Sequence, residues 1–521
     1  MATEILETER KYEAQPGVPL PPLDTLPEVA EVSVPETETL VAEYYDTDDL
    51  RLLKAGATLR RRAGGADEGW HLKLPSDPKN GRKSGKKDSA GAASRLEIRL
   101  PASRPGDPVP DELARLVRVH TRGAALRPVA RLDTRRRTTT LLDTAGTSLA
   151  AVMADEVAAQ TFGESTTLSR WNEIEVELTG GGPRLLRAAD KRLRHGGLRP
   201  AAYSAKLARA LAGEAPPSGD EHPLSKHPLA GEIVFGYLSS QAATLKALDP
   251  AVRRGAADSI HQMRVAARRL RSTLQSFPAV VPAQSSAHLR KELKWLGGVL
   301  GDARDSEVLS DWLLTRIAGT PTELVMGPVA ARVRAHFAPR EADAQRAVLL
   351  ALDSQRYFSM LDELDRLLEH PPLTAAAAEP ADKALPRAVA RAHRRTARRM
   401  RTAKRAPAGQ ARDVALHETR KAAKRARYTA EAAEPASGKK ARRFAERMKT
   451  VQSVLGDHQD AVNARATARE IGVQAHLAGE SAFTFGLLEG RAHCEALAIQ
   501  RQARKAWRRA AHGKHAWPSA R

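Results

Sequence analysis

Residues 7–11 read Glu7-Thr8-Glu9-Arg10-Lys11, and this short stretch decides how the first part of the chain folds. Side chains alternate across a β-strand, so Glu7, Glu9 and Lys11 are expected to share one face. Two carboxylates and an ammonium group make a poor surface for an apolar core. They suit a divalent cation that holds a phosphate chain, because Mg²⁺ prefers oxygen ligands and pairs with phosphoryl oxygens. Taken alone, the stretch favours a solvated edge strand with mixed charges, and the rest of the first two hundred residues changes that balance.

Eight strand-like runs, separated by turn signals, occupy the first 180 residues and predict an antiparallel barrel or sandwich. Period two gives most of them one charged face. The shared faces are Arg60 with Arg62; His71 with Lys73; Arg95, Glu97 and Arg99; Arg131, Asp133 and Arg135; and Glu173, Glu175 and Glu177. Acids on the first and last strands, with bases between them, favour a polar barrel interior. Such a barrel has room for one small ligand, and arginine binds phosphate oxygens through its planar fork.

The chain divides near Gly213–Pro228, where Pro, Gly and small polar residues predict a linker. Beyond it, apolar residues recur at three- and four-residue spacing, which predicts helices only. We expect an α+β protein: an N-terminal eight-stranded antiparallel β-barrel with a tunnel, followed by an all-α duplicated helical-bundle domain. The expected ranges are 1–212 for the barrel, 213–224 for the linker, 225–512 for the helical domain and 513–521 for a basic tail. Residues 76–94 are expected to form a disordered loop.

The chain of 521 residues carries a formal charge of +22, so polyanions are the expected partners: nucleic acid, anionic membrane or polyphosphate. Aromatic residues make up only 4%, which argues against single-strand binding by base stacking. The single cysteine, Cys494, fits a reducing cytosol. No signal-peptide pattern is present, and no apolar run approaches the roughly 18 residues that span a bilayer. We therefore expect a cytoplasmic protein without a membrane partner.

Two segments of the second half repeat each other. Residues 260–271 read IHQMRVAARRLR and residues 416–427 read LHETRKAAKRAR, with six of twelve positions identical. Further along, VLGDARD (299–305) is matched by VLGDHQD (454–460). Both pairs run in the same order, so this half is an internal duplication.

A basic stripe flanks a core stripe in each copy. The apolar seam of the first copy is Ile260, Met263, Ala267, Leu270, Leu274 and Phe277. The basic residues follow one position later, about 100° around the helix. They are His261, Arg264, Arg268 and Arg271 in the first copy and His417, Arg420, Lys424 and Arg427 in the second. An ordinary solvated face would interleave acids at i+4, and these stripes contain none, so they predict a polyanion site.

The motifs of the first half resemble the CYTH domain over about residues 4–210. They are Glu7-x-Glu9-x-Lys11, Tyr44-Tyr45-Asp46-Thr47, Leu59-Arg60-Arg61-Arg62, Trp70-His71-Leu72-Lys73 and Glu173-Ile174-Glu175-Val176-Glu177-Leu178. Proteins of this family are triphosphate tunnel metalloenzymes, which hydrolyse or cyclise triphosphate compounds inside an eight-stranded antiparallel barrel. The family often places Ser-Lys after the last strand. This chain has Ser204-Ala205-Lys206, which leaves the role of Lys206 open.

The resemblance implies site residues by position. The implied catalytic residues are Glu7, Glu9, Lys11, Glu173 and Glu175, and the implied ligands of Mg²⁺ or Mn²⁺ are Glu7, Glu9, Asp155 and Glu175, with Glu173 and Glu177 as further candidates. The implied phosphate-binding residues are Lys11, Arg60, Arg62, Lys73, Arg95 and Arg135. In phosphoryl transfer such groups mainly position the substrate and neutralise its charge.

The duplicated helices resemble the CHAD domain over about residues 225–512. The resemblance rests on His261 and His417 in paired basic helices and on the two LGD segments. This family folds as two helical bundles related by a pseudo-twofold axis and binds inorganic polyphosphate in a basic groove between them. It implies that both basic stripes line that groove. The basic segment 391–405 either extends the groove or faces water.

Together these features predict a metal-dependent inorganic triphosphatase that also binds polyphosphate, with inorganic tripolyphosphate and long-chain polyphosphate as partners. One alternative is a non-catalytic polyphosphate-binding or targeting protein. Another is an organic triphosphatase, acting on thiamine triphosphate or a nucleoside triphosphate, or a nucleotide cyclase. No feature identifies a base-binding pocket, so the inorganic substrate is inferred from the fused helical module. Net charge alone also suits nucleic acid, but no recognition motif for it is present. The absence of a Walker loop argues against a P-loop ATPase.

Overall fold

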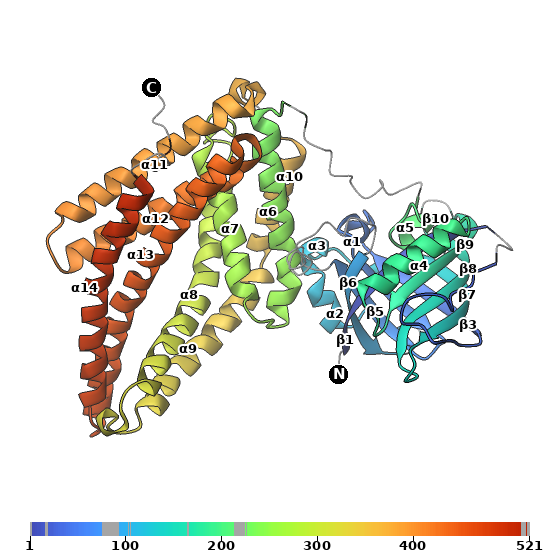
Figure 1. Ribbon diagram of the computed structural model, residues 1–521, viewed down its shortest axis with the longest axis horizontal. Coiled ribbons are helices and arrows are strands. Elements are labelled where there is room, and N and C mark those ends of the chain that lie inside the picture. Colours follow the sequence, from blue (N-terminus) through green and yellow to red (C-terminus); the bar gives the residue numbers. More distant parts are fainter. Residues whose placement is uncertain are drawn as a thin grey trace. The chain divides into compact units, whose positions relative to one another are not determined.

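The computed structural model describes residues 3–15, 19–75, 93–102, 104, 106–163, 166–212, 225, 227–372, 374–511 and 517 (Figure 1). The chain forms two compact units, Met1–His222 and Pro223–Arg521. The first is a β-barrel with short helices and the second is helical. The expected linker at 213–224 and residues 76–92 of the expected loop lie outside the described residues, whereas residues 93 and 94 begin a strand.

Eight antiparallel strands close into the predicted barrel. Their order is β1 (Thr3–Ala14), β6 (Ala93–Pro101), β5 (Gly69–Pro75), β4 (Thr58–Ala63), β3 (Glu36–Asp46), β7 (Arg127–Leu142), β8 (Ser148–Thr161) and β9 (Leu168–Leu178). Pairing of β9 with β1 completes the ring and leaves no free sheet edge between them. Two short strands extend it: β2 (Glu31–Val32) pairs with β7, and β10 (Arg199–Pro200) pairs with β1.

Apolar side chains cover the outside of the barrel. Helix α4 (Pro183–His195) packs Leu185 and Leu193 against Ile174 and Val176 of β9 (Figure 1). On another side, Trp70 belongs to a second apolar cluster with residues of the short helices α1 (Arg51–Lys54) and α2 (Asp111–Leu116); a further short helix, α3 (Arg118–Thr121), follows α2. Because alternate side chains point to opposite faces, burying these apolar residues outside turns the charged positions of the same strands inward.

One end of the barrel interior is apolar. Helix α5 (Lys206–Ala210) places Leu207 among the inward-facing side chains of Tyr44, Leu132 and Trp171. The Arg209 guanidinium lies over the Trp171 ring, 5.1 Å from its centroid. The sequence between the last long strand and the linker therefore supplies a plug that closes this end of the tunnel with packed side chains.

The second unit is all-helical, as predicted. Its helices are α6 (Ala230–Arg253), α7 (Ser259–Ser276), α8 (Ala287–Ala318), α9 (Val329–Leu352), α10 (Gln355–Glu369), α11 (Ala381–Arg405), α12 (Gln410–Ala432), α13 (Glu434–Leu477) and α14 (Phe483–Ala511), with single 3-10 turns at Thr322–Leu324 and Ala375–Ala378. Among the described helices, none is long and apolar enough to cross a membrane.

The repeated basic segments lie in α7 and α12, which pack against each other. The Thr429 hydroxyl of α12 lies 2.8 Å from the Ser276 hydroxyl of α7. The predicted core stripe of α7 is buried, with Met263, Leu270 and Leu274 fully enclosed. The LGD segments lie within α8 and α13, each beside the basic helix of its own copy.

The chain end returns to the helical unit. Trp517 donates its indole N–H to the carbonyl of Pro386, 3.1 Å away, and its ring meets Phe444 edge-on. The side chain is only 5% exposed. The tail at 513–521, expected to be merely basic, therefore includes a buried aromatic anchor at its one described residue.

The plug can be tested by Leu207→Ala. Leu207 is 1% exposed, and its loss leaves a cavity beside Trp171, so unfolding of the barrel should cost about 2–5 kcal/mol less. The measurement is urea unfolding followed by tryptophan fluorescence. The control is Leu6→Ala, at a position 62% exposed, which should change the free energy of unfolding by less than about 0.5 kcal/mol. Equal effects of both substitutions would show that α5 is not part of the packed barrel.

Candidate tunnel site and basic groove

Charged side chains from almost every strand meet inside the barrel. The cavity is lined by Glu7, Glu9, Lys11, Tyr44, Thr58, Arg60, Arg62, Asp67, Lys73, Arg95, Arg99, Arg136, Glu175, Glu177, Ala205 and Lys206. The lining includes most of the residues predicted for the tunnel. Arginines and a lysine of the adjacent strands β4, β5 and β6 form a basic wall, and the acids of β8 and β9 form an acidic wall. Strand β1 joins the two walls with residues of both signs.

The predicted position of Arg135 is wrong. Its side chain is exposed on the outer face of β7, together with Arg131 and Asp133, and the neighbouring Arg136 points into the tunnel. The inward face of this strand carries Leu132 and Thr134, both buried, so it is the less charged of the two. From the sequence, the face with more charges, that of Arg131, Asp133 and Arg135, is the one predicted to point inward. Because successive side chains of a strand point to opposite faces, this prediction replaced Arg136 by Arg135.

Three carboxylates of the acidic wall form a cluster that suits a metal ion. Asp155, Glu173 and Glu175 each offer an oxygen, and these atoms all lie within 4.8 Å of one another. The Lys206 ammonium lies 2.9 Å from Asp155 and 2.7 Å from each glutamate. Arg136 forms two hydrogen bonds to Asp155, at 2.8 and 2.7 Å. The structure thus brings Lys206, whose role the sequence left open, into the centre of the acidic wall.

The electrostatics of this cluster favour the ionised forms of Asp155 and Glu175. Burial alone would raise the pKa of Glu175, but Lys11, Lys206 and Arg136 hold that pKa well below its usual value. Burial opposes the charge of Lys206 as well, yet Asp155 and Glu175 raise its pKa well above normal. Buried charges persist because each is paired with its opposite.

The donor set fits Mg²⁺ or Mn²⁺, since hard divalent cations take carboxylate oxygens. Of the residues predicted as metal ligands, Asp155 and Glu175 lie in the cluster. Glu173, a further candidate, completes it. Glu9 lies 3.4 Å from Lys11, which also contacts Glu175. Glu9 therefore reaches the cluster through this shared lysine.

A second network surrounds Glu7. Lys73 lies 2.5 Å from its carboxylate, and burial, only partly offset by Lys73, raises the pKa of Glu7 to about 7. Glu97 lies 3.7 Å from the Lys73 ammonium and 2.8 Å from Nδ1 of His71. Burial lowers the pKa of His71 to about 4, so this ring is neutral at neutral pH. His71 thus supports Glu97 and does not line the cavity, although it shares a strand face with Lys73.

Sequence reasoning assigned no role to several lining groups. Tyr44 was seen only as part of a motif, yet its hydroxyl accepts from Arg60 at 3.3 Å inside the tunnel. Burial opposes ionisation of this phenol, but Arg60 and Lys206 lower its pKa. Arg99 contacts Glu7 at 3.4 Å and also pairs with Glu97. The alternation that identified Arg95 and Glu97 applied to Arg99 as well and was the available signal.

In the helical unit, both LGD glycines support an arginine of the neighbouring basic helix. A Cβ at Gly301 would lie 2.9 Å from a terminal nitrogen of Arg264, and one at Gly456 would lie 3.0 Å from that of Arg420. A larger residue at either position would therefore require the guanidinium group to shift. Arg264 also pairs with Asp305 at 2.8 Å. The LGD segments therefore orient the arginines, a role for the glycine that the sequence did not suggest.

Four cations of α7 and α12 converge. Burial, together with Arg268 and Arg420, lowers the pKa of the Lys424 ammonium to about 6. Burial also lowers the pKa of Arg268, and Arg264 and Arg420 add to this effect. Arg264, Arg268, Arg420 and Lys424 are called the groove cations, and each pair that lowers a neighbour's pKa comes from the facing helices α7 and α12. The helix stripe expected from the sequence is thus gathered into a compact cationic surface.

The residues at the ends of the two stripes have different surroundings from the groove cations. His261 and His417 are half-buried, and burial lowers the pKa of each. Arg427 pairs with Glu431 at 2.7 Å, an i,i+4 contact. The expectation that the stripes have no acid at this spacing is therefore wrong for Arg427, because the quoted repeat stopped before Glu431.

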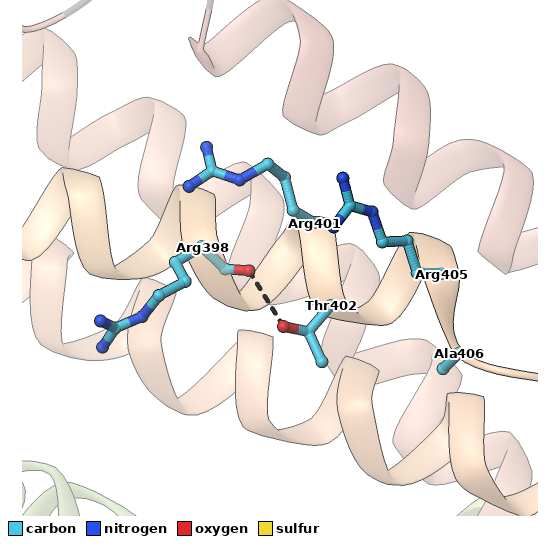
Figure 2. A pocket seen from close by; sticks show the side chains of 5 residues that line it. All are labelled: Arg398, Arg401, Thr402, Arg405 and Ala406. Atoms are coloured by element: carbon cyan, nitrogen blue, oxygen red, sulfur yellow. Dashed lines mark hydrogen bonds between the residues drawn. The ribbon is translucent and has the colours of Figure 1, made fainter.

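A second basic surface lies at the end of α11, within the segment 391–405. A hollow there is lined by Arg398, Arg401, Thr402, Arg405 and Ala406 (Figure 2). The three arginines come from successive turns of one helix, and the Thr402 hydroxyl donates to the backbone carbonyl of Arg398. Within the described residues, none of the three arginines forms an ion pair.

Comparisons with known proteins match both halves of the chain. The CYTH domain model matches residues 6–201 and the CHAD domain model matches residues 236–469. Uncharacterized proteins of two Mycobacterium tuberculosis strains are 37% identical over 502 residues, covering 93% of this chain and 92% of each relative. The CHAD domain from the plant Ricinus communis is 25% identical, with a TM-score of 0.45, and covers 57% of this chain and 97% of that chain.

A fourth relative matches the barrel. It is a candidate adenylyl cyclase from Hippeastrum that is described as having a dominant triphosphatase activity. The two chains are 17% identical, with a TM-score of 0.25, and the match covers 41% of this chain and 100% of that chain.

The acidic wall predicts the behaviour of Lys206→Met. Removing one partner of a buried ion pair leaves uncompensated charge and costs about 3–5 kcal/mol, so the variant should be less stable than the wild type without divalent metal. Mg²⁺ or Mn²⁺ should then raise its melting temperature more than that of the wild type, because the three carboxylates lack their internal cation. Thermal unfolding with and without metal measures both effects. The control Arg135→Gln, on the outer face, should match the wild type. A metal response equal to that of the wild type would argue against a metal site at this cluster.

Proposed function

Since the chain belongs to the family of proteins that join a CYTH domain to a CHAD domain, we propose that its barrel hydrolyses inorganic triphosphate with a divalent metal and that its helical unit binds polyphosphate. The observation that carries this proposal is the division of the tunnel into a basic and an acidic wall. A triphosphate has oxygens for the basic wall and can share a cation with the acidic wall, so it suits the space between them.

The lining favours an inorganic substrate over an organic one. Thirteen of the sixteen lining residues are charged, and the others are Tyr44, Thr58 and Ala205. A nucleobase or a thiamine ring binds best against apolar and aromatic surface. In the described part of the barrel, Tyr44 is the one aromatic residue of the lining, and its hydroxyl is engaged by Arg60.

The residues of this chain would act mainly by position and charge. Arg60, Arg62 and Arg95 can hold phosphoryl oxygens through paired N–H groups, and Lys73 adds a point charge. Asp155, Glu173 and Glu175 would hold the metal, which supplies charge neutralisation and an activated water. Because α5 fills one end of the barrel, the phosphate chain would enter end-on from the other. Little covalent work by the protein is needed for such a transfer.

For the helical unit, the supporting observation is preorganisation. Arg264 and Arg420 are pressed against Gly301 and Gly456, so their guanidinium groups are held before a ligand arrives. Immobilised side chains lose less entropy on binding than free ones do. The groove cations crowd together at an energetic cost that a bound polyanion would offset.

The hydrolysis is tested by Glu9→Gln. Glu9 is buried in the tunnel between Glu7 and Lys11, so its loss should lower metal-dependent hydrolysis by more than the roughly 10–100-fold that loss of an outer-shell metal partner costs. The measurement is phosphate release from tripolyphosphate, ATP and thiamine triphosphate, with and without Mg²⁺ or Mn²⁺. Arg135→Gln serves as the control with normal activity. Undiminished release by the Glu9→Gln variant would remove Glu9 from the site, and faster turnover of ATP or thiamine triphosphate would favour the organic alternative.

The groove predicts a pH dependence of polyphosphate binding. With its pKa lowered to about 6, Lys424 is mostly neutral at pH 8, and a polyanion stabilises its charged form. Binding should therefore take up a proton, and affinity should rise between pH 8 and pH 6 by at most about tenfold per pH unit. Titrations at constant ionic strength measure this change.

The matched variants separate Lys424 from its neighbours. Lys424→Met should flatten the pH profile, whereas His261→Gln and His417→Gln should change it less, because the two histidines lie at the ends of the stripes and outside the groove cations. A profile that survives Lys424→Met would assign the proton to another group.

A further inference from the structure

Helices α7 and α12 make a reciprocal pair of contacts that the internal duplication explains. The two basic segments align with an offset of 156 residues, so Arg269 corresponds to Arg425 and Gln275 corresponds to Glu431. Arg269 contacts Glu431 at 3.2 Å, and Arg425 donates to the side-chain oxygen of Gln275. The two contacts are therefore copies of each other, but one acceptor is an acid and the other a neutral amide.

The Glu431 side is the part of the α7–α12 contact around Glu431, and the Gln275 side is the equivalent part around Gln275. On the Glu431 side, a carboxylate neutralises the arginines and tyrosine rings pack beside them. Glu431 accepts from Arg427 at 2.7 Å as well as from Arg269, and the Tyr237 hydroxyl lies 3.5 Å away. Both guanidinium groups lie over the ring of Tyr428, at 5.7 and 5.5 Å from its centroid. One carboxylate and two tyrosines therefore occupy the space around these arginines.

The Gln275 side has cations without an acid. Arg271, Arg290, Arg395 and Arg425 gather there from α7, α8, α11 and α12. Across the described ranges of the chain, no carboxylate forms an ion pair with any of the four. Arg290 is held in place by the carbonyls of Ala283 at 2.7 Å and Ser286 at 3.2 Å. Residue 272, which corresponds to Tyr428, is a serine, so the counterpart of that ring is missing here.

The crowding of cations on this side affects the pKa of Arg425. Burial, followed by the charges of Arg395, Arg271 and Arg290, lowers the pKa of Arg425 to about 10. Four guanidinium groups from four helices thus lie close enough to disfavour one another. Arginines bind phosphate oxygens in pairs, and several on one surface suit an anion with repeated charges.

The cationic surface continues along α11. Arg395, Arg398, Arg401 and Arg405 are spaced by three or four residues, so they lie on one side of the helix. Successive members are about 4.5–6 Å apart along the axis, which suits a flexible chain with a charge on every unit. The last three line the hollow shown in Figure 2. This row therefore links the Gln275 side to the end of the helix.

We propose that a polyphosphate chain bound by the helical unit leaves the crossing of α7 and α12 on the Gln275 side and continues along α11 to the hollow at Arg398, Arg401 and Arg405, while the Glu431 side binds no phosphate. This inference rests on the polyphosphate-binding part of the proposed function and adds a direction to it. The two halves of the duplication then have different roles, decided at one pair of equivalent positions.

The test places an acid at the neutral position of the full chain. Gln275→Glu gives Arg425 an internal partner and repels phosphate, so affinity for long-chain polyphosphate should fall about tenfold or more. The salt dependence of binding should also weaken by about one unit of log–log slope. Titrations contain EDTA, so that the barrel does not consume the ligand, and circular dichroism confirms folding of each variant.

Two matched variants complete this test. Gln345→Glu, on α9, adds the same charge elsewhere and should change affinity by less than about twofold. Glu431→Gln removes the acid from the other side and should not weaken binding. An equal loss in Gln275→Glu and Gln345→Glu, or a loss in Glu431→Gln as large as that in Gln275→Glu, would overturn the proposal.

A second pair of variants tests the path along α11 without touching the helix crossing. Arg398→Gln with Arg401→Gln should weaken polyphosphate binding by about tenfold, whereas Arg504→Gln with Arg508→Gln, exposed on α14, should weaken it far less. Equal losses in the two double variants would overturn the path.

Two further outcomes identify the ligand. Duplex DNA of matched charge should bind more weakly and be less sensitive to the α11 substitutions; equal binding and equal sensitivity would assign the surface to nucleic acid. Failure of the wild type to bind polyphosphate at all would instead overturn the proposed function of the helical unit.

Discussion

The ion pairs of Lys206 with the carboxylates of Asp155, Glu173 and Glu175 are the interaction on which the barrel depends. Charge removed from water is costly unless an opposite charge replaces the lost solvation. The barrel meets this requirement by placing a lysine from α5 among acids from β8 and β9. The same helix inserts Leu207 into the apolar end of the interior. One short helix therefore both closes the tunnel and balances its acidic wall.

The helical unit meets the opposite problem, an excess of positive charge. On the Glu431 side this positive charge is paired with an acid and lies beside aromatic rings, and the charge of Arg264 is paired with the carboxylate of Asp305. Near Lys424 the excess remains, and burial together with the neighbouring arginines lowers the pKa of its ammonium group. The glycines of the LGD segments allow arginines to lie against α8 and α13, so that crowded cations stay ordered. Ordered cations that no acid of the described helices neutralises thus remain beside Lys424.

Much of this arrangement follows from alternation and periodicity. The closed barrel, the inward faces of β1, β4 and β9, and the duplicated basic helices were predictable because repeated charge on one face is a local pattern. Arg136 was not, since β7 carries charges on both faces and the sequence does not say which face is inside. Lys206 and Gly301 were also beyond reach, because their roles depend on residues far away along the chain. Glu431 lay four residues beyond the end of the compared repeat and was missed for that reason.

The plug formed by α5 determines how molecules can enter and leave the barrel. With Leu207 and Trp171 packed at one end, substrate and product share a single opening. If the barrel hydrolyses phosphate chains as proposed, it would act on chain ends, because a long polymer could not pass through it and be cut in the middle. Each product would have to leave before the next molecule entered, so turnover would be sensitive to accumulated phosphate. The barrel interior would thus be a pocket that is open at one end, rather than a channel that is open at both.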